Sequence, residues 1–463
     1  MFVRALLILL ASVATAGAFA SGVTLPDAER IVLDNGTVVI LNEKHEVPLI
    51  GLRAIVRGGA VTDPADKHGL AALLASLLEK GAGDRTAAEF AEAVAAAGGR
   101  LTATADLESL IVSADFMAQD AALMVELVSD LLRRPTLAAA EFKKLRSRSI
   151  NLIKAAKGSD PAELISSYAN AFLFGEHPYG NPVGGSEASL AAITHADLLA
   201  YYAAAIGGDR LIIAVSGDFD IAQMRTALTA AFSGWRPATR PLPEIAAPES
   251  AIGRRVFLID KPGATQSYFY VGNVAVSRAF AGRAELDLAN TVFGGRFTSM
   301  LMTELRTKSG LSYGARSRLA RYSQPGSMFI SSFTATETTV AALDVALATL
   351  ERLRSHGLDG DMIVSARNYL MGQYPPRFET AAQLAGQFAA LEAHGLGVSY
   401  VNEYGSDLAA ATVESIAAVI KRVYPPADRL VFVILGDAEL IRDEVAQYGP
   451  VTEISIASPQ FHP

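Results

Sequence analysis

The feature that most constrains the fold is a helix–strand–turn unit that occurs twice. The sequence "DRLIIAVSGDFD" at residues 209–220 recurs as "DRLVFVILGDAE" at residues 428–439, 219 positions later. In each copy a continuous apolar run rich in β-branched residues is followed by a Gly-Asp turn, a pattern typical of a buried strand. Each copy also follows a helical segment, for which Thr194 and Thr412 are the expected N-caps. A shared unit at equal depth in both halves indicates an internal duplication.

The segments before each unit match less closely but in the same order. Residues 29–44 predict a hairpin that turns at Asn35-Gly36, and a strand and a helix follow. Residues 254–276 again contain two strand-like runs around a turn, before another helix. Four prolines at residues 235–250 indicate a linker. We therefore predict an α+β fold of two tandem homologous domains, residues 21–237 and 251–463, hinged at a Pro-rich linker at residues 238–250.

Composition narrows the classes of function. The chain has 463 residues, 51% of them hydrophobic, which is enough for two domains with large cores. Its formal net charge of −8 argues against nucleic acid or an anionic membrane surface as the main partner. The absence of cysteine excludes disulfides, thiolate zinc sites and a cysteine nucleophile.

The N-terminus has the pattern of a secretory signal peptide. Arg4 precedes an apolar stretch at residues 5–16, and Ala18-Phe19-Ala20 gives a small-x-small cleavage site. A membrane anchor is the alternative, but the apolar stretch is shorter than the ~20 residues that a spanning helix needs. We predict that residues 1–20 are removed and that the protein is exported to the periplasm.

Several motifs together resemble the pitrilysin/insulinase family of zinc peptidases. In the first half these are "EKGAGDRT" at residues 79–86, "GEHPYGNPVGG" at 175–185 and "VSGDFD" at 215–220. In the second half they are "FGGRFTSMLMTELRTKSGLSYGA" at residues 293–315 and the helical stretch at 366–397. The resemblance covers essentially the whole mature chain, and it implies two similar lobes around a cavity.

The family binds zinc through the inverted motif H-x-x-E-H on its first long helix. Two histidines four residues apart take two corners of the zinc tetrahedron, and the glutamate acts as general base. When "HGLAALLASLLEKGAGDRT" at residues 68–86 is aligned with this motif, Ala72 and Ser76 stand at the histidine positions and Ala75 at the glutamate. The third ligand, a glutamate on a later helix, is replaced by Asn151 or Leu152. The sequence therefore predicts no metal ligand and no cofactor in this chain.

The histidines offer no alternative zinc site. His68 lies one turn before Ala72, and His45 is the next histidine along the sequence. The other five histidines have no second histidine at i+3 or i+4; they are His177, His195, His356, His394 and His462. His177 fits the family's structural "HP" turn, so we interpret all seven as polar or turn residues.

The second half retains residues of chemical interest. Arg306 and Tyr313 have the seven-residue spacing of the arginine–tyrosine pair with which this family's second half completes the active site. By the same resemblance, Gly294, Gly295 and Arg296 are candidate substrate-binding residues. The alternative is that Arg306 is a surface helix charge and Tyr313 is half-buried core. Further basic residues suit an acidic peptide or a solvated surface; they are Lys308, Arg316, Arg318 and Arg321.

The resemblance implies a role within a complex. We predict a non-catalytic subunit of a heterodimeric zinc metallopeptidase, which supplies Arg306 and Tyr313 to the zinc site of a paralogous subunit that carries H-x-x-E-H. The alternative is a structural or peptide-binding scaffold with no part in catalysis. An unrelated serine hydrolase has no support, because Ser76 lies in no G-x-S-x-G elbow.

Overall fold

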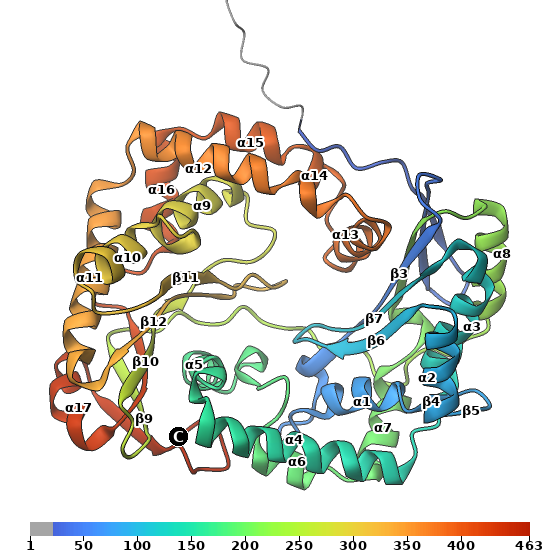
Figure 1. Cartoon of the computed structure of the whole chain (residues 1–463), viewed down its shortest axis with the longest axis horizontal. Coiled ribbons are helices and arrows are strands. Elements are labelled where there is room, and N and C mark those ends of the chain that lie inside the picture. Colours follow the sequence, from blue (N-terminus) through green and yellow to red (C-terminus); the bar gives the residue numbers. More distant parts are fainter. Residues whose placement is uncertain (1–21) are drawn as a thin grey trace, which may run out of the picture.

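The computed structural model describes residues 22–463, so the predicted signal peptide lies outside the described residues. Two β-sheets face each other across the molecule, and helices link them above and below to give a ring-like outline (Figure 1). Within residues 22–463, no helix has both the length and the apolar character needed to cross a membrane.

The first sheet is built from the N-terminal half. Its strands are β1 (Glu29–Val32), β2 (Val38–Glu43), β3 (Leu49–Arg57), β6 (Arg100–Ala105), β7 (Ser109–Met117) and β8 (Leu211–Gly217). They lie in the order β1-β2-β8-β3-β7-β6. Only β2 and β8 run parallel to each other; the other neighbours are antiparallel.

The second sheet is built from the C-terminal half. Its strands are β9 (Arg255–Asp260), β10 (Gln266–Val274), β11 (Ala315–Leu319), β12 (Ser327–Ala335), β13 (Val431–Gly436) and β14 (Val451–Ser455). The order is β11-β12-β10-β13-β9-β14. A short pair, β4 (Gly81–Ala82) and β5 (Arg85–Thr86), lies apart from both sheets.

Five strands of each sheet correspond in order and direction, as the duplication predicts. β2, β8, β3, β7 and β6 of the first sheet match β9, β13, β10, β12 and β11 of the second. The edges differ, because β1 is antiparallel to β2 whereas β14 is parallel to β9. The hairpin at Asn35-Gly36 forms, but the runs at residues 254–276 form β9 and β10, which are separated by β13.

The helices of the first half connect its strands. They are α1 (Leu70–Leu78), α2 (Ala87–Ala96), α3 (Ala121–Arg133), α4 (Ala139–Ser159), α5 (Ile165–Phe174), α6 (Glu187–Ala192), α7 (His195–Ala205) and α8 (Ile221–Phe232). Helices α1, α3 and α8 pack against the first sheet. Thr194 begins α7 with a side chain that accepts a hydrogen bond from the Asp197 N–H. Thr412 begins the equivalent helix of the second half in the same way, with Ser415 as donor, so both predicted N-caps are confirmed.

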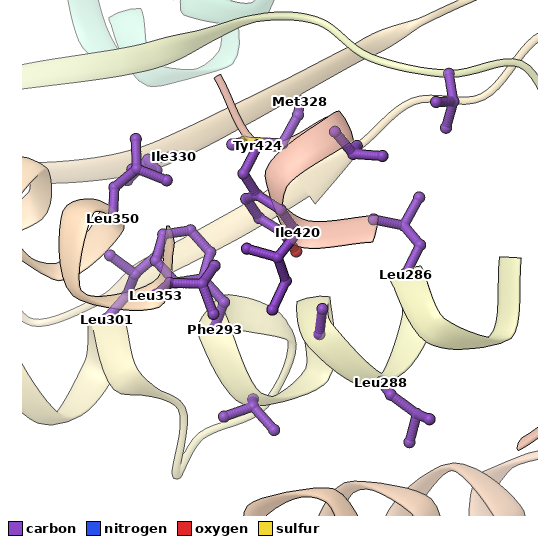
Figure 2. Packing of buried hydrophobic residues seen from close by; sticks show 14 of the residues in the cluster. Leu286, Leu288, Phe293, Leu301, Met328, Ile330, Leu350, Leu353, Ile420 and Tyr424 are labelled. Carbon is purple, nitrogen blue, oxygen red and sulfur yellow. The ribbon is translucent and has the colours of Figure 1, made fainter. Parts of the chain in front are cut away.

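The second half follows the same plan with more helices. They are α9 (Arg283–Asn290), α10 (Met300–Met302), α11 (Thr339–His356), α12 (Gly360–Gln373), α13 (Ala381–Ala393), α14 (Ser399–Asn402), α15 (Tyr404–Ala410), α16 (Val413–Val423) and α17 (Ala438–Val445). Figure 2 shows the core that α9, α11 and α16 form with one face of the second sheet, where Phe293 and Tyr424 meet edge to face at 5.3 Å between ring centroids.

The two halves exchange one helix each. α5 of the first half packs on β10 and β13 of the second sheet, and Phe172 stacks on Phe257 with 4.7 Å between ring centroids. α13 of the second half packs on β3 and β8 of the first sheet (Figure 1). At Gly51 a Cβ atom would lie 2.5 Å from the Cα of Ala382, so β3 and α13 approach closely only because this residue is glycine. Each sheet is therefore covered by a helix of the other half.

A second contact joins the halves at the tip of the β11–β12 hairpin. The Glu108 carboxylate accepts hydrogen bonds from the Ser323 N–H, at 3.1 and 3.0 Å, and from the Tyr179 hydroxyl at 2.6 Å. Tyr179 also packs against Tyr322, with 4.7 Å between ring centroids. This contact holds the hairpin of the second half against the first half.

Candidate functional site

Helix α1, where the family carries its zinc motif, is positioned by a buried carboxylate. Asp63 accepts hydrogen bonds from the N–H groups of Gly69, Leu70 and Ala71, at 2.8, 3.1 and 2.9 Å. These are three of the donors that the first turn of a helix leaves without partners. Burial raises the pKa of Asp63 to about 7, although the three N–H donors act to lower it.

The three motif positions on α1 lie in different surroundings. Ala75 is buried, Ala72 is half-buried and Ser76 is exposed. Their side chains carry no imidazole or carboxylate, so they do not fit a zinc ion. The positions suggested for the third ligand, Asn151 and Leu152, are exposed on α4.

Neither His68 nor His45 belongs to a group of side chains that could hold a metal ion. His68 is half-buried, and burial lowers its pKa. His45 lies between the carboxylates of Asp218 and Glu43, which raise its pKa. Residues 22–463 contain no group of three or more His, Cys, Asp or Glu that could hold a metal ion.

The predicted residues of the second half begin at a tight turn. After α9 the chain continues in a π-helical turn, Thr291–Gly295, which packs against β11. A Cβ atom at Gly294 would lie 2.2 Å from the Ser317 nitrogen, so only glycine allows this approach. The turn therefore packs tightly on β11 just before Arg296.

Arg306 and Tyr313 are in direct contact. The Arg306 guanidinium carbon lies 4.2 Å from the centre of the Tyr313 ring and 4.9 Å from that of Phe297. Gly310 reverses the chain between them with φ of 66°. Tyr313 is 74% exposed and Phe297 69% exposed, so the alternative of a half-buried core tyrosine is wrong. The arginine lies between two exposed aromatic rings, an arrangement that favours a cation.

The predicted residues line one pocket of about 980 Å³. Gly294, Gly295, Arg296, Arg306 and Tyr313 all contribute to it. A smaller pocket of about 340 Å³ shares Arg306 and Tyr313 with the larger one. No residue of α1 lines either of these two pockets.

The remaining walls come from elements that sequence reasoning did not connect with the pair. Tyr268 and Tyr270 of β10 and Phe333 of β12 form the floor, on the sheet face that α5 partly covers. Ala162 and Ile165 of the first half close one side. Buried and less buried residues alternate over residues 266–271 of β10, but the sequence QSYFYVGNV does not show this alternation, and it did not indicate that the first half supplies a wall.

Comparison with known proteins places these features in a family. The family model "Insulinase (Peptidase family M16)" matches residues 38–187, and "Peptidase M16 inactive domain" matches residues 192–370. An "Uncharacterized zinc protease" of Mycobacterium tuberculosis strain H37Rv is 28% identical over 336 residues, 71% of this chain and 75% of the relative.

Two further comparisons concern proteins described as inactive. A "Non-peptidase homolog YmxG" of Helicobacter pylori is 24% identical over 348 residues, which are 74% of this chain and 78% of the relative. The crystal structure of a peptidase M16 inactive domain from Pseudomonas fluorescens has a TM-score of 0.82 at 22% identity, and the match covers 89% of this chain and 98% of that one. With both family models matched over residues 38–187 and 192–370, the chain belongs to peptidase family M16, the insulinase family.

Proposed function

We propose that this chain is the zinc-less subunit of a two-subunit zinc metallopeptidase, in which it supplies Arg306 and Tyr313 to the active site of a paralogous subunit. The observation that carries the proposal is the Arg306–Tyr313 contact at the wall of the 980 Å³ pocket, with the Tyr313 ring exposed. A substrate that enters the pocket can reach both polar groups.

In this proposal, Arg306 and Tyr313 stabilise the negative charge that develops on the substrate's carbonyl oxygen. When a peptide bond is hydrolysed, the carbonyl oxygen becomes negative in the tetrahedral intermediate. The Tyr313 hydroxyl donates one hydrogen bond, and the Arg306 guanidinium adds positive charge with several N–H donors. Because both donors are held before the substrate arrives, little reorganisation is needed during the reaction.

The proposal includes a cellular location and a division of the chain. Residues 1–20 are proposed to direct export to the periplasm, where the mature protein meets its partner. Residues 21–237 and 251–463 are proposed as the two domains, with residues 238–250 as their linker. The segment at residues 238–254 contains no helix or strand, which supports a linker there.

The first prediction concerns catalysis by the assembled pair. Tyr313→Phe removes only a hydroxyl, and Arg306→Ala removes the charge, so each is expected to lower kcat/KM by about 10²–10³ while assembly is unchanged. Arg306→Lys keeps the charge but loses the planar fork, and should restore only part of the rate. The measurement is turnover of a flexible peptide by this chain reconstituted with an H-x-x-E-H paralogue, with complex formation followed by size-exclusion chromatography.

Arg148→Ala provides the control, because Arg148 is exposed on α4 and lies outside both pockets. It is expected to leave turnover unchanged. If the Tyr313→Phe and Arg306→Ala complexes assemble and turn over peptide like wild type, the chain acts as a scaffold and the catalytic role is rejected.

A further inference from the structure

The 980 Å³ pocket is lined by positive charge without compensating negative charge. Four arginines contribute to its walls, and no aspartate or glutamate does, although the chain as a whole carries a net charge of −8. The four are Arg296, Arg306, Arg316 and Arg318. Within residues 22–463, none of them forms an ion pair within 4.0 Å, whereas the neighbouring Arg321 pairs with Asp287.

The hydrogen-bond partners of these arginines are neutral. The Arg296 Nη1 donates to the Ser365 hydroxyl at 2.9 Å, and the Arg318 Nε donates to the Ser331 hydroxyl at 3.0 Å. A serine holds a guanidinium in position but leaves its charge in place. The other N–H groups of each fork therefore keep their capacity to bind a carboxylate.

Strand β11 presents two of the arginines on the same face. Arg316 and Arg318 alternate with buried residues, and both are exposed. Arg316 lies opposite Ser331, which in turn lies opposite Tyr270, so all three side chains are on the sheet face that forms the pocket floor. Arg296 and Arg306 come from the segments on either side of α10. Positive charge therefore enters the pocket both from strand β11 and from the segments that flank α10.

Six aromatic residues also line the pocket. Phe297, Tyr313, Phe333 and Tyr369 join the two tyrosines of β10. Aromatic residues and arginine are the types that contribute most to binding of peptides and proteins. A volume near 1,000 Å³ is at the upper end of the range for ligand pockets. The Gly294 turn packs closely against β11 at Ser317, beside this pocket.

We propose that this pocket binds an acidic peptide segment, with at least two carboxylates held by Arg316 and Arg318, and so selects substrates by negative charge. The inference rests on the proposed function, because it names the substrate class for the same site. The binding step, however, uses residues of this chain alone. Negative charge elsewhere on the protein disfavours a long polyanion, which is why we infer a short peptide segment and not a nucleic acid.

The test is direct binding by the purified full-length mature chain without any partner. The probe is a fluorescein-labelled octapeptide with four Glu or Asp residues, and Kd is measured by fluorescence anisotropy. The matched peptide has Gln and Asn in their place. The acidic peptide is expected to bind at least ~10-fold more tightly, and its affinity is expected to fall as salt is raised.

Substitutions of single arginines test whether the acidic peptide binds in this pocket. Arg316→Gln and Arg318→Gln are each expected to weaken acidic-peptide binding about 10-fold, since each removes charge-assisted hydrogen bonds. Arg148→Gln on α4 removes one exposed positive charge outside the pocket and is expected to leave Kd unchanged. Arg316 has no hydrogen-bond or ion-pair partner in residues 22–463, so its replacement should not disturb folding, which the melting temperature checks.

Each remaining outcome overturns the inference. These outcomes are equal binding of the amide peptide, wild-type binding by both pocket variants, an equally charged oligonucleotide that binds as tightly, and no binding. Failure of the proposed function looks different, because loss of the catalytic role would appear in the turnover of the reconstituted pair and leave this binding measurement unaffected.

Discussion

At the scale of single residues, the carboxylate of Asp63 caps helix α1, although that helix carries no metal ligand. Asp63 holds three N–H groups at the start of α1, although Ala72, Ala75 and Ser76 give that helix no metal ligand. Helix α1 has to be packed and capped in any case, because its leucines belong to the first core. The carboxylate therefore has a structural task that does not depend on zinc.

The residue-scale prediction follows from this task. Asp63→Ala leaves three buried N–H groups without an acceptor, and is expected to lower the free energy of unfolding by about 3 kcal/mol or more. Urea denaturation measures the change. Asp66→Ala is the control, since Asp66 is exposed three residues away and should alter stability by less than about 0.5 kcal/mol. Equal stability of Asp63→Ala and wild type would show that the cap is dispensable.

At this scale a motif placed the candidate site residues, and their role in binding or catalysis stays a prediction. Arg306, Tyr313 and the glycines of the turn were expected together, and they line one pocket. For Arg316 the sequence left open an acidic peptide or a solvated surface, since a charge in the sequence does not show whether a carboxylate faces it in the fold. The exposure of Tyr313 was also open, because spacing along a chain does not determine burial.

At the scale of elements, one glycine determines how the turn after α9 meets the second sheet. Gly294→Ala would place a methyl group 2.2 Å from the Ser317 nitrogen, so the backbone must move. We expect a loss of about 1–3 kcal/mol in stability and weaker peptide binding in the adjacent pocket. Thermal unfolding and fluorescence anisotropy measure the two effects.

A second glycine provides the matched control. Gly372 lies in α12, and a Cβ atom there would meet nothing within 4 Å. Gly372→Ala should therefore leave binding unchanged and raise stability by about 0.5–1 kcal/mol, because alanine favours a helix. Similar behaviour of both variants would mean that the close approach at Gly294 has no energetic role.

Turns and helix caps were predicted correctly from residues close in sequence, but the neighbours of each strand in the sheet were not predicted. The Asn35-Gly36 turn and the caps at Thr194 and Thr412 depend on residues close in sequence, and all three formed. The two runs at residues 254–276 formed strands, but β13 inserted between them. Periodicity shows which face of a strand is apolar, and it does not show which distant strand will lie beside it.

At the scale of the whole molecule, the exchange of α5 and α13 makes the halves depend on each other. The inner face of the first sheet is covered by Leu384 and Phe388 from the second half, within a core that includes Ile40 and Ile212. We predict that residues 22–250 expressed alone do not melt cooperatively and bind a hydrophobic dye, because this face stays open.

Adding residues 251–463 should reverse both effects, as followed by near-UV circular dichroism and dye fluorescence. Gly51→Ala in the intact chain offers an independent check, because its methyl group would collide with Ala382 and weaken the same contact. A fragment of residues 22–250 that melts cooperatively by itself would contradict the dependence.

The exchange also has a consequence for the order of events during synthesis. A ribosome makes the chain from its N-terminus, and the last strand of the first sheet ends at Gly217, whereas the helix that covers this sheet ends at Ala393. The ribosome therefore adds 176 more residues after β8 before the helix that covers this apolar face is complete. Until those residues are made, the exposed apolar face favours aggregation. The first sheet can therefore finish folding only when the chain is nearly complete, and a chaperone is expected to bind this face before then.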